Sequence, residues 1–435
     1  MELVVIADDL TGALDATAPF LPDQVAVLTS TAALDAWEDD LELQLDAPHV
    51  RNALVLGVNT ASRHLPPLQA AERVHAAADW AMSRPEHPRI MKKVDSVLRG
   101  NVLAELEAIV AACDYPGIVL CPALPAQGRV TIGGVQYDQG PSTYNMDGPL
   151  PTNGKATDLR AFVPNGYRVT SVDARSLRPA ALANCLQAAT NRIGLALVDI
   201  GSDEDLAVLA ASLRGMPDVL VVGSSGIMRA MGRLRYSPGR DRLTAVSGSQ
   251  LVVTASQHAA VRGQVRKLAA QRKDAEVIEL DVKKLQSYEA ADQAISMAQR
   301  ASAVLTSGGV AVLTVPAVEL IDERRAAFYQ PASTLINSTL AAATAKILDG
   351  SAQPSRLLIL GGDVAAAVCH QLDVHTLVPI EEATPGAVIC TGITSVSRPT
   401  PLPAILVRSG GFGDENNLLT LIGISPTSHK KVHVD

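Results

Sequence analysis

A chain of 435 residues, with 47% hydrophobic and 19% charged residues, is too apolar to be largely disordered and long enough for two hydrophobic cores. The net charge of −8, the 3% aromatic content and the scattered lysines and arginines argue against a surface that binds nucleic acid. The five cysteines are an odd number and form no C-x-x-C pair, which predicts reduced core thiols rather than disulfides or a zinc site.

The chain opens directly into an apolar segment without a basic leader, and no apolar run approaches the roughly 20 residues that span a bilayer. We therefore expect a cytoplasmic protein that binds neither membrane nor nucleic acid. A homo-oligomer is left open, because the residues assign no oligomeric state.

The first predicted strand, Glu2 to Ala7, runs directly into Asp8 and Asp9, at the point where a helix must begin. In an open parallel sheet, the carboxyl ends of the strands form the crevice in which ligands bind. An aspartate there is either a helix cap, which contributes about 1 kcal/mol, or a working carboxylate. One cap needs one aspartate, and a second adds like-charge repulsion, so we favour a functional role for at least one of the pair.

Short runs rich in Val, Ile and Leu alternate with helical segments through the first half of the chain. Continuous apolar runs are typical of parallel strands that helices cover on both faces. The stretch Gln127 to Gly140 has no helical period and is predicted to be a hairpin or a projecting loop. The predicted strands are Val25 to Leu28, Ala53 to Val58, Ile90 to Val94, Gly117 to Leu120, Gly194 to Ile200 and Val219 to Gly223, with helices over Pro66 to Ser83 and Val102 to Cys113.

A dense polar cluster follows the strand that ends at Val94. Lysine and arginine bind a carboxylate or phosphate, while aspartate and serine orient hydroxyl groups, so the cluster suits a small anionic ligand. The alternative is a solvated turn with Asp95 or Ser96 as a helix cap, and we favour the ligand site. The cluster comprises Lys92, Lys93, Asp95, Ser96, Arg99, Gly100 and Asn101.

Two weaker signals lie nearby. Arg63 follows a third strand end and is either a surface charge or a guanidinium that binds an acidic substrate through two hydrogen bonds. Gln127 and Arg129 flank a glycine at a predicted turn, which by itself is a weak sign of a binding loop.

The second half of the chain restarts the same alternation after a polar stretch that contains Pro238 and Gly239. We predict an N-terminal domain over 1–235, a linker over 236–249, a C-terminal domain over 250–424 and a frayed tail over 425–435. Both domains are expected to be α/β with mainly parallel sheets. The predicted strands are Leu251 to Ala255, Glu276 to Val282, Val310 to Val315, Arg356 to Leu360 and Ala404 to Val407, with helices over 258–272 and 335–348.

Glycine-rich turns follow two strands of this second domain, at Gly361 to Asp363 and at Ser409 to Asp414. Glycines at a helix start let the backbone approach a phosphate, and two such turns favour a nucleotide more than either does alone. There is no P-loop motif. Ser256 and His258 invite a hydrolase reading, but no G-x-S-x-G elbow surrounds the serine, so we favour a phosphate contact by its hydroxyl.

Taken together and in order, these segments make the chain resemble the four-carbon acid sugar kinases, whose members act on threonate, erythronate and oxo-tetronates. The resemblance spans nearly the whole chain. It rests on Ile6 to Ala13, Lys92 to Asn101, Pro122 to Arg129, Gly361 to Asp363 and Ser409 to Gly413.

The resemblance implies an N-terminal acid-sugar-binding domain, a C-terminal nucleotide-binding domain and ATP-dependent phosphorylation of a terminal hydroxyl of a small sugar acid. Asp8 or Asp9 would serve as the base, a choice that the residues leave open, and Mg²⁺ is expected without assigned ligands. The residues on the acid side are Asp8, Asp9, Arg63, Lys93, Asp95, Ser96, Arg99, Gln127 and Arg129. Those expected to contact ATP are Ser256, Gly361, Gly362, Asp363, Val364 and Gly410.

Three segments on the nucleotide side depart from the family pattern. The family more often has Lys-Ser-Gly-Asn-Phe-Gly at Arg408 to Gly413, Gly-Gly-Glu-Thr at Gly361 to Val364, and a Ser-Gly-Ser run at Thr254 to His258. These departures motivate an alternative, a sugar-acid-binding protein without phosphoryl transfer. The stretch Ser142 to Asp158 also departs, which leaves open an acid other than threonate or erythronate. A dehydrogenase is disfavoured because no strand leads into G-x-G-x-x-G.

Overall fold

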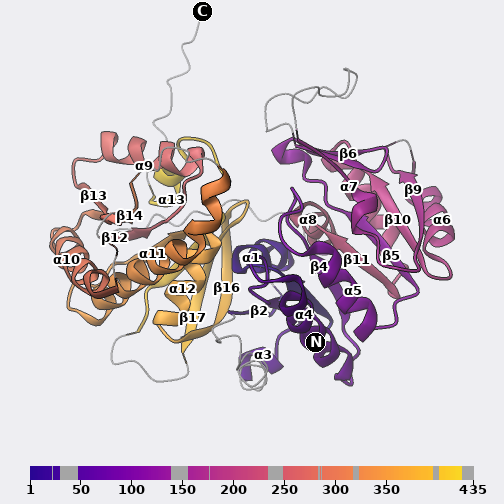
Figure 1. Ribbon diagram of the computed structural model, residues 1–435, viewed down its shortest axis with the longest axis horizontal. Helices are drawn as coiled ribbons and strands as arrows, with labels where there is room; N and C mark the ends of the chain where they lie inside the picture. Colours follow the sequence, from indigo (N-terminus) through magenta and orange to yellow (C-terminus); the bar gives the residue numbers. More distant parts are fainter. Residues whose placement is uncertain are drawn as a thin grey trace, which may run out of the picture. The chain divides into compact units, whose positions relative to one another are not determined.

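The computed structural model describes residues 1–21, 23–29, 48–138, 155–175, 177–233, 248–282, 285, 287–316, 323–394 and 401–423. The chain divides into two compact units, Met1–Gly239 and Arg240–Asp435, each of which is α/β (Figure 1). The predicted frayed tail 425–435, residues 236–247 of the predicted linker and residues 142–154 of the divergent stretch lie outside the described residues.

The sheet of the N-terminal unit is parallel throughout, as the continuous apolar runs predict. Strand β1 lies between β3 and β4, and Ala7 at its end pairs with Asn59 on one side and Lys93 on the other. Three strand ends are therefore level at the point where the strand order reverses, which is where open α/β sheets bind ligands. The order is β2 (Val25–Leu28), β3 (Val55–Asn59), β1 (Leu3–Ala7), β4 (Arg89–Lys93), β11 (Val219–Gly223), β5 (Gly117–Cys121), β10 (Gly194–Asp199) and β9 (Arg168–Asp173).

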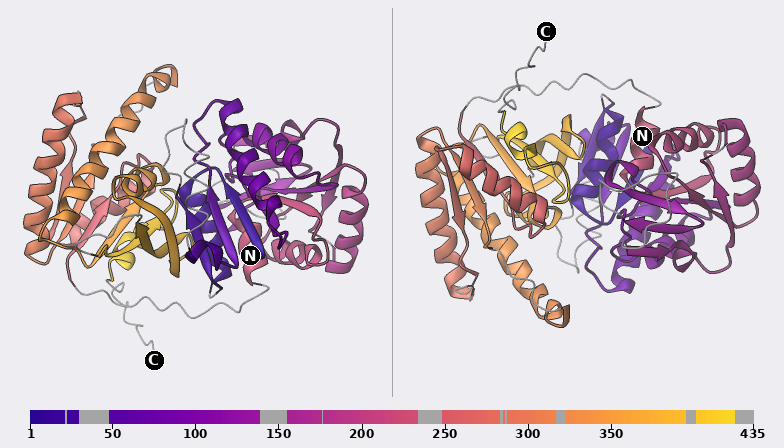
Figure 2. Two further views of the ribbon diagram at one scale, coloured as in Figure 1. Left: turned by 90° about the horizontal axis from the view of Figure 1, so that it is seen from below. Right: turned by 90° about the horizontal axis from the view of Figure 1, so that it is seen from above.

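Helices cover both faces of this sheet (Figure 2). Helices α4 (Pro67–Ser83) and α5 (Val102–Ala112) pack against one face, where Leu106 and Leu120 are fully buried. Each such leucine contributes about 1.5–3 kcal/mol by leaving water. The other face is covered by α1 (Leu10–Thr17), α6 (Pro179–Thr190), α7 (Asp203–Leu213) and α8 (Ser225–Arg233). Short elements complete the unit: α3 (Pro48–Arg51), η1 (Ala18–Phe20), η3 (Pro125–Gln127) and η4 (Leu159–Phe162).

A hairpin projects from the sheet within the stretch Gln127 to Gly140, which confirms that prediction. Its strands are β6 (Arg129–Ile132) and β7 (Val135–Asp138), and β8 (Lys155–Asp158) adds a third strand. Gly133 and Gly134 form the turn with φ of +62° and +74°, values that strain any residue other than glycine. Asp199, the last residue of β10, accepts hydrogen bonds from both glycine N–H groups at 2.7 and 2.9 Å, which anchors the hairpin to the sheet.

The C-terminal unit has a second sheet, parallel over five strands and antiparallel over two. The parallel strands are β13 (Ala275–Glu279), β14 (Val310–Thr314), β12 (Gln250–Val253), β15 (Arg356–Leu360) and β18 (Ala404–Arg408) in that order. Strand β17 (Ala387–Thr394) pairs antiparallel with both β18 and β16 (Val374–Thr384). The strand order of this sheet reverses at β12. The sequence analysis predicted neither β16 nor β17.

Helix α9 (Ala259–Gln271) packs beside α13 (Asn417–Leu421) over the core that Val252, Val312 and Leu358 form. Helices α10 (Ser287–Thr306), α11 (Glu323–Asp349) and α12 (Gly362–Gln371) pack side by side. The predicted helix 335–348 is therefore the C-terminal half of a longer one. The other predicted strands and helices agree with the observed ones to within three residues at each end.

Four of the five cysteines are buried, as predicted, and all five are free thiols, but Cys185 is exposed on α6. In the part of the chain that the structure describes, no helix is long and apolar enough to cross a membrane.

Candidate functional site

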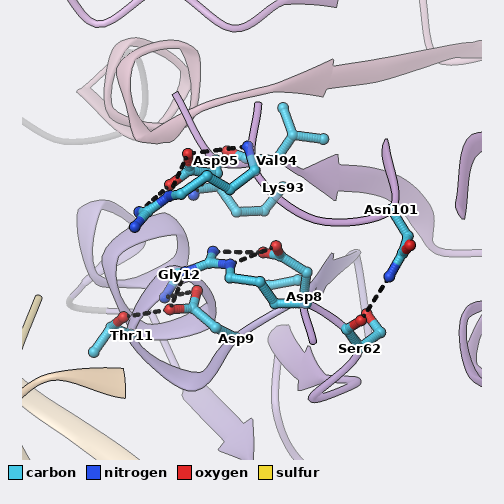
Figure 3. A network of polar contacts seen from close by, with 12 residues as sticks. Asp8, Asp9, Thr11, Gly12, Ser62, Lys93, Val94, Asp95 and Asn101 are labelled. Atoms are coloured by element: carbon cyan, nitrogen blue, oxygen red, sulfur yellow. Dashed lines mark hydrogen bonds and ion pairs between the residues drawn. The ribbon is translucent and has the colours of Figure 1, made fainter. Parts of the chain in front are cut away.

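One arginine binds the two aspartates that follow β1. Arg63 donates from Nε and Nη2 to the two carboxylate oxygens of Asp8, at 2.8 and 2.9 Å, and from Nη1 to Asp9 Oδ2 at 2.9 Å. Figure 3 shows the Asp8 and Asp9 side chains close to one another at this strand end. The repulsion between adjacent carboxylates is thus balanced by a cation from the end of the neighbouring strand.

Local structure places Asp9, whose side chain is the N-cap of α1. Its Oδ1 accepts from the Gly12 N–H at 2.8 Å, and its Oδ2 accepts from Thr11 Oγ1 at 2.7 Å. A β-carbon on residue 12 would lie 2.4 Å from Asp9 Oδ1, so only glycine leaves room for this cap. The capping alternative therefore holds for Asp9, whereas Asp8 is bound by Arg63.

The bidentate partner of Arg63 is the Asp8 carboxylate. The sequence analysis left open whether Arg63 is a surface charge or a fork onto the substrate, and a surface position is wrong, because the side chain is only 13% exposed. Burial opposes its charge, but the Asp9 and Asp8 carboxylates outweigh that effect and raise the pKa of Arg63 above its usual value. Three of its five N–H groups are engaged, which leaves two for a ligand.

Lys93, the last residue of β4, brings an ammonium group to the same place. Its Nζ donates to the Val94 carbonyl at 2.9 Å and would lie 3.4 Å from a β-carbon on Gly12. The ammonium group therefore lies over the start of α1, beside Asp9 (Figure 3). Because an ammonium group has three N–H donors, Lys93 retains donors for an anionic ligand.

Asp95 and Arg99 form a bidentate ion pair just after β4. Arg99 donates from Nη2 to Asp95 Oδ1 at 2.6 Å and from Nε to Asp95 Oδ2 at 3.0 Å. Burial raises the pKa of Asp95, but the hydrogen bond and charge of Arg99, with Arg63 and Lys93, outweigh it and hold that pKa well below its usual value. The Arg99 side chain is 62% exposed, so its remaining N–H groups face solvent.

Neither Asp95 nor Ser96 caps a helix, so the capping alternative for that cluster is wrong. The Asp95 carboxylate instead accepts the N–H groups of Val97 and Arg99, which shapes a turn before α5 begins at Val102 with Asn101 as its N-cap.

The hairpin delivers Arg129 to the same turn. Arg129 Nη1 donates to Ser96 Oγ at 2.7 Å and to Gln127 Oε1 at 2.6 Å, which brings three predicted residues together. The sequence analysis missed Gln136, a buried residue of β7 whose Nε2 donates to the Ser96 carbonyl at 2.9 Å. The only sequence signal for it was an amide side chain within a predicted hairpin.

A buried polar network, which the sequence analysis also missed, joins the three strand ends from below. Lys92 of β4 is fully buried and pairs with Glu105 of α5 at 2.7 Å. Ser62 Oγ donates to Glu105 Oε1 at 2.5 Å and lies 2.8 Å from Thr60 Oγ1, which donates to the Ala7 carbonyl of β1. Lys92 thus belongs to the support of the site rather than to its surface.

The loop that carries Arg63 is held from several sides. Ser62 N–H and Arg63 N–H both donate to the Asp8 carbonyl, and Asn101 Nδ2 donates to the Ser62 carbonyl at 3.0 Å. Arg73 of α4 donates to the Thr60 carbonyl, also at 3.0 Å. Arg63 is therefore preorganised before any ligand arrives.

In the C-terminal unit, the predicted nucleotide residues lie at three neighbouring strand ends. A β-carbon on Gly410, after β18, would lie 2.7 Å from the Ser256 hydroxyl, after β12. The Gly361 N–H, after β15, donates to the Arg408 carbonyl at 2.9 Å. Ser256, Gly361 and Gly410 thus lie together at the edge where this sheet reverses order.

Gly361 is the N-cap of α12 and has a φ of +127°, a conformation that only glycine adopts without strain. Gly362 and Asp363 occupy the first turn, where helix N–H groups have no partner within the helix. Val364 is 2% exposed and packs in the core, so that residue offers a ligand its backbone and not its side chain.

His258 caps α9, because its Nδ1 accepts from the Ala260 N–H. The Ser256 hydroxyl accepts from the backbone N–H of His258 at 3.2 Å, and nothing that the structure describes links that hydroxyl to the imidazole. The Ser/His pair therefore lacks the arrangement of a hydrolase.

Family models match both units of the chain. Residues 3–231 match a sugar-binding N-terminal domain, and residues 245–418 match a nucleotide-binding C-terminal domain. A D-threonate kinase from Bordetella bronchiseptica is 30% identical, over 95% of this chain and 95% of its own. A 3-oxo-tetronate kinase from Cupriavidus necator is 27% identical, over 94% of this chain and 93% of its own.

The fold is also similar to that of a solved protein from Salmonella typhimurium LT2, described as a putative tRNA synthase. The TM-score is 0.72 over 96% of this chain and 98% of the other, at 19% identity, so this likeness shows the fold alone.

The buried Lys92–Glu105 pair gives a stability prediction. Glu105→Gln leaves the Lys92 charge buried without a partner, which should lower the free energy of unfolding by about 3–5 kcal/mol. Urea denaturation of the full chain measures this. Glu107→Gln, on the same helix, is the matched control and should change stability by no more than about 0.5 kcal/mol. The double variant Lys92→Met/Glu105→Leu should recover most of the loss, and a loss for Glu105→Gln no larger than that of Glu107→Gln would contradict the assignment.

Proposed function

This chain belongs to the four-carbon acid sugar kinase family, and we propose on that premise that it transfers the γ-phosphoryl group of ATP to a terminal hydroxyl of a four-carbon sugar acid. Threonate, erythronate and oxo-tetronates define the substrate class. The observation that carries the proposal is the set of acidic and basic side chains at the reversal point of the N-terminal sheet. A cytoplasmic location, where ATP is supplied, is part of the same proposal.

The basic groups of this set bind the acid. Lys93 and Arg99 have N–H groups left over from their protein contacts and attract the substrate carboxylate. Arg63 has two N–H groups left over, and Ser96, Gln127 and Arg129 form a connected set of polar groups for the substrate hydroxyls. Asp95 fixes the Arg99 guanidinium, so Arg99 is oriented before substrate arrives.

Asp8 and Asp9 act on the reacting hydroxyl. Arg63 donates to both carboxylates, and a carboxylate oxygen accepts more than one hydrogen bond, so each carboxylate can also accept from the substrate hydroxyl. In the transfer, the substrate oxygen forms a bond to the γ-phosphorus, the bond from that phosphorus to ADP breaks, and the hydroxyl proton passes to a carboxylate. The Asp9 carboxylate accepts two hydrogen bonds from the first turn of α1, whereas the Asp8 carboxylate is bound by Arg63. We therefore place the base at Asp8, with Asp9 as the alternative.

The turns of the C-terminal unit bind ATP. The backbone N–H groups of the first turn of α12, which begins at Gly362, and of Gly410 are donors suited to phosphate oxygens, as is the Ser256 hydroxyl, while the Gly361 N–H is held by the Arg408 carbonyl. Val364 contributes its backbone. Kinase sites hold Mg²⁺ through one or two carboxylates plus substrate phosphates, and Asp363 is a carboxylate in the first turn of α12, so the residues fit a Mg²⁺–ATP complex. Bound Mg²⁺ neutralises phosphate charge.

Among the residues that the structure describes, no feature favours the binding-only alternative. The altered turns keep their glycines at Gly361 and Gly410, and Ser256 lies against the second of them.

Coupled ADP release tests the activity directly. Purified protein with ATP and Mg²⁺ is assayed against D- and L-threonate, D-erythronate and the oxo-tetronates. Acid-dependent ADP release is expected for at least one of them. If none of these acids causes ADP release but one of them still raises the unfolding temperature, the result would instead support the binding-only alternative.

The base assignment predicts the effect of removing one carboxylate. Asp8→Asn should lower kcat by about 10²- to 10⁴-fold because the variant cannot accept the hydroxyl proton. Asp9→Asn should lower it less, since asparagine still caps α1. Asp173→Asn, which alters an exposed Asp–Arg pair, is the control and should leave kcat unchanged. If Asp8→Asn also lowers the unfolding temperature substantially, the loss of kcat would point to a structural role for Asp8.

The carboxylate anchor predicts a KM effect. Arg99→Ala should raise KM for the acid by about 10- to 100-fold, the usual worth of a hydrogen bond to a charged group, with little change in KM for ATP. Arg175→Ala removes an arginine from an exposed pair and should change neither constant. An unchanged KM for the acid in Arg99→Ala removes that residue from the site.

A further inference from the structure

Arg408, the last residue of β18, carries a fully buried guanidinium group. Its Nη2 donates to Gln264 Oε1 at 2.6 Å, and its Nη1 donates to Asn417 Oδ1. Its Nε has no hydrogen-bond partner. Among the residues that the structure describes, no carboxylate lies within ion-pair distance of Arg408, so neutral amides alone surround its charge.

Such a charge is costly, because a buried ion loses its hydration and normally needs a counter-ion. Burial lowers the pKa of Arg408 to about 10, which still leaves it protonated at neutral pH. Packing alone does not call for a cation here, since an apolar side chain of similar volume would fill the same space at lower cost. The position therefore calls for a functional explanation.

The amides that bind Arg408 also hold the glycine-rich turn that follows it. Gln264 Nε2 donates to the carbonyls of Phe412, Gly413 and Asp414, the last at 2.7 Å. Gly413 has a φ of +81°, and a β-carbon there would lie 2.4 Å from Asn417 Cγ, so the Asn417 side chain packs directly on the turn.

The second glycine-rich turn is tied to the same residue, because the Arg408 carbonyl accepts the Gly361 N–H at 2.9 Å. Arg408 thus contacts one turn through its backbone and the other through Gln264 and Asn417. Its charge lies directly beneath the two turns proposed to bind phosphates.

We propose that Arg408 is a positioning residue of the nucleotide site, which fixes both glycine-rich turns from inside and has the nucleotide polyphosphate as its missing counter-ion. This inference rests on the proposed ATP-dependent function. Because Arg408 is buried, it acts on the phosphates through its field and through the turns rather than by contact. The nucleotide-free protein then holds an uncompensated charge that bound phosphates balance.

Arg356 provides a matched control. It is the first residue of β15, the strand that neighbours β18, and pairs with Ala404, whereas Leu360 at the other end pairs with Arg408. Arg356 is also buried, donates to a backbone carbonyl at 3.2 Å and has an Nε without a partner. Both arginines are therefore buried, at opposite ends of one strand pair, and Arg408 is the more deeply buried of the two.

The test measures the affinity of the full chain for AMP, ADP and ATP by calorimetry. Arg408→Gln should weaken ATP binding by about 10- to 100-fold, ADP binding less and AMP binding least, because the loss of a charge grows with the charge of the ligand. Arg408→Lys should restore most of the affinity, and Arg356→Gln should change none of the three. KM for the acid should be unaffected in all variants. Equal weakening for AMP, ADP and ATP would show a purely structural role and overturn the inference.

A second variant supplies the counter-ion within the protein and covers the case in which Arg408→Gln fails to fold. Asn417→Asp replaces an amide acceptor of Arg408 by a carboxylate of the same shape. It should raise the unfolding temperature without nucleotide and weaken ATP binding more than AMP binding. Unchanged ATP binding in Asn417→Asp would overturn this inference and leave the proposed function standing. A wild-type protein that binds none of the three nucleotides would overturn both.

Discussion

The acid site depends on one electrostatic constraint: two adjacent carboxylates can share a strand end only if a cation holds them. Arg63 meets that constraint by binding Asp8 through two hydrogen bonds and Asp9 through a third. Its loop is in turn fixed by Ser62, whose hydroxyl joins the buried Lys92–Glu105 pair. The rigidity of the carboxylates thus comes from charge pairing that extends from the crevice into the core, and a preorganised group loses little entropy when substrate binds.

The two units differ in the partners of their buried charged side chains. In the N-terminal unit, Asp8, Asp95 and Glu105 each have a cationic partner within the protein, so the acid site is close to neutral before it is occupied. In the C-terminal unit, the Arg408 guanidinium is bound by the side-chain amides of Gln264 and Asn417, with no carboxylate partner among the described residues. This difference matches the proposed ligands. A small acid with one carboxylate needs a few oriented donors, whereas a polyphosphate brings several negative charges that an uncompensated cation stabilises.

Much of the fold was predictable because buried parallel strands are continuous apolar runs, and such runs are visible without knowledge of their neighbours. Two of the strands that were missed, β9 and β16, lack this signature. Strand β9 is an exposed edge strand in which only Val172 is buried. Strand β16 contains a proline and two glutamates, and its pairing with β17 shifts register three times, so no regular alternation survives in the sequence.

For the sites, the sequence by itself determined which residues stand at strand ends, since a polar cluster after an apolar run marks that place. It could not determine which of them bind one another. Arg63 and Asp9 are 54 residues apart, and Arg408 and Gln264 are 144 residues apart, so their contacts depend on the order of strands in the sheet. Glu105 and Gln136 carry no local sign of their role for the same reason. The periodicity of apolar residues shows which side chains of a short segment are buried. Which charged side chains pair with one another depends on the crossover connections that bring distant strand ends together.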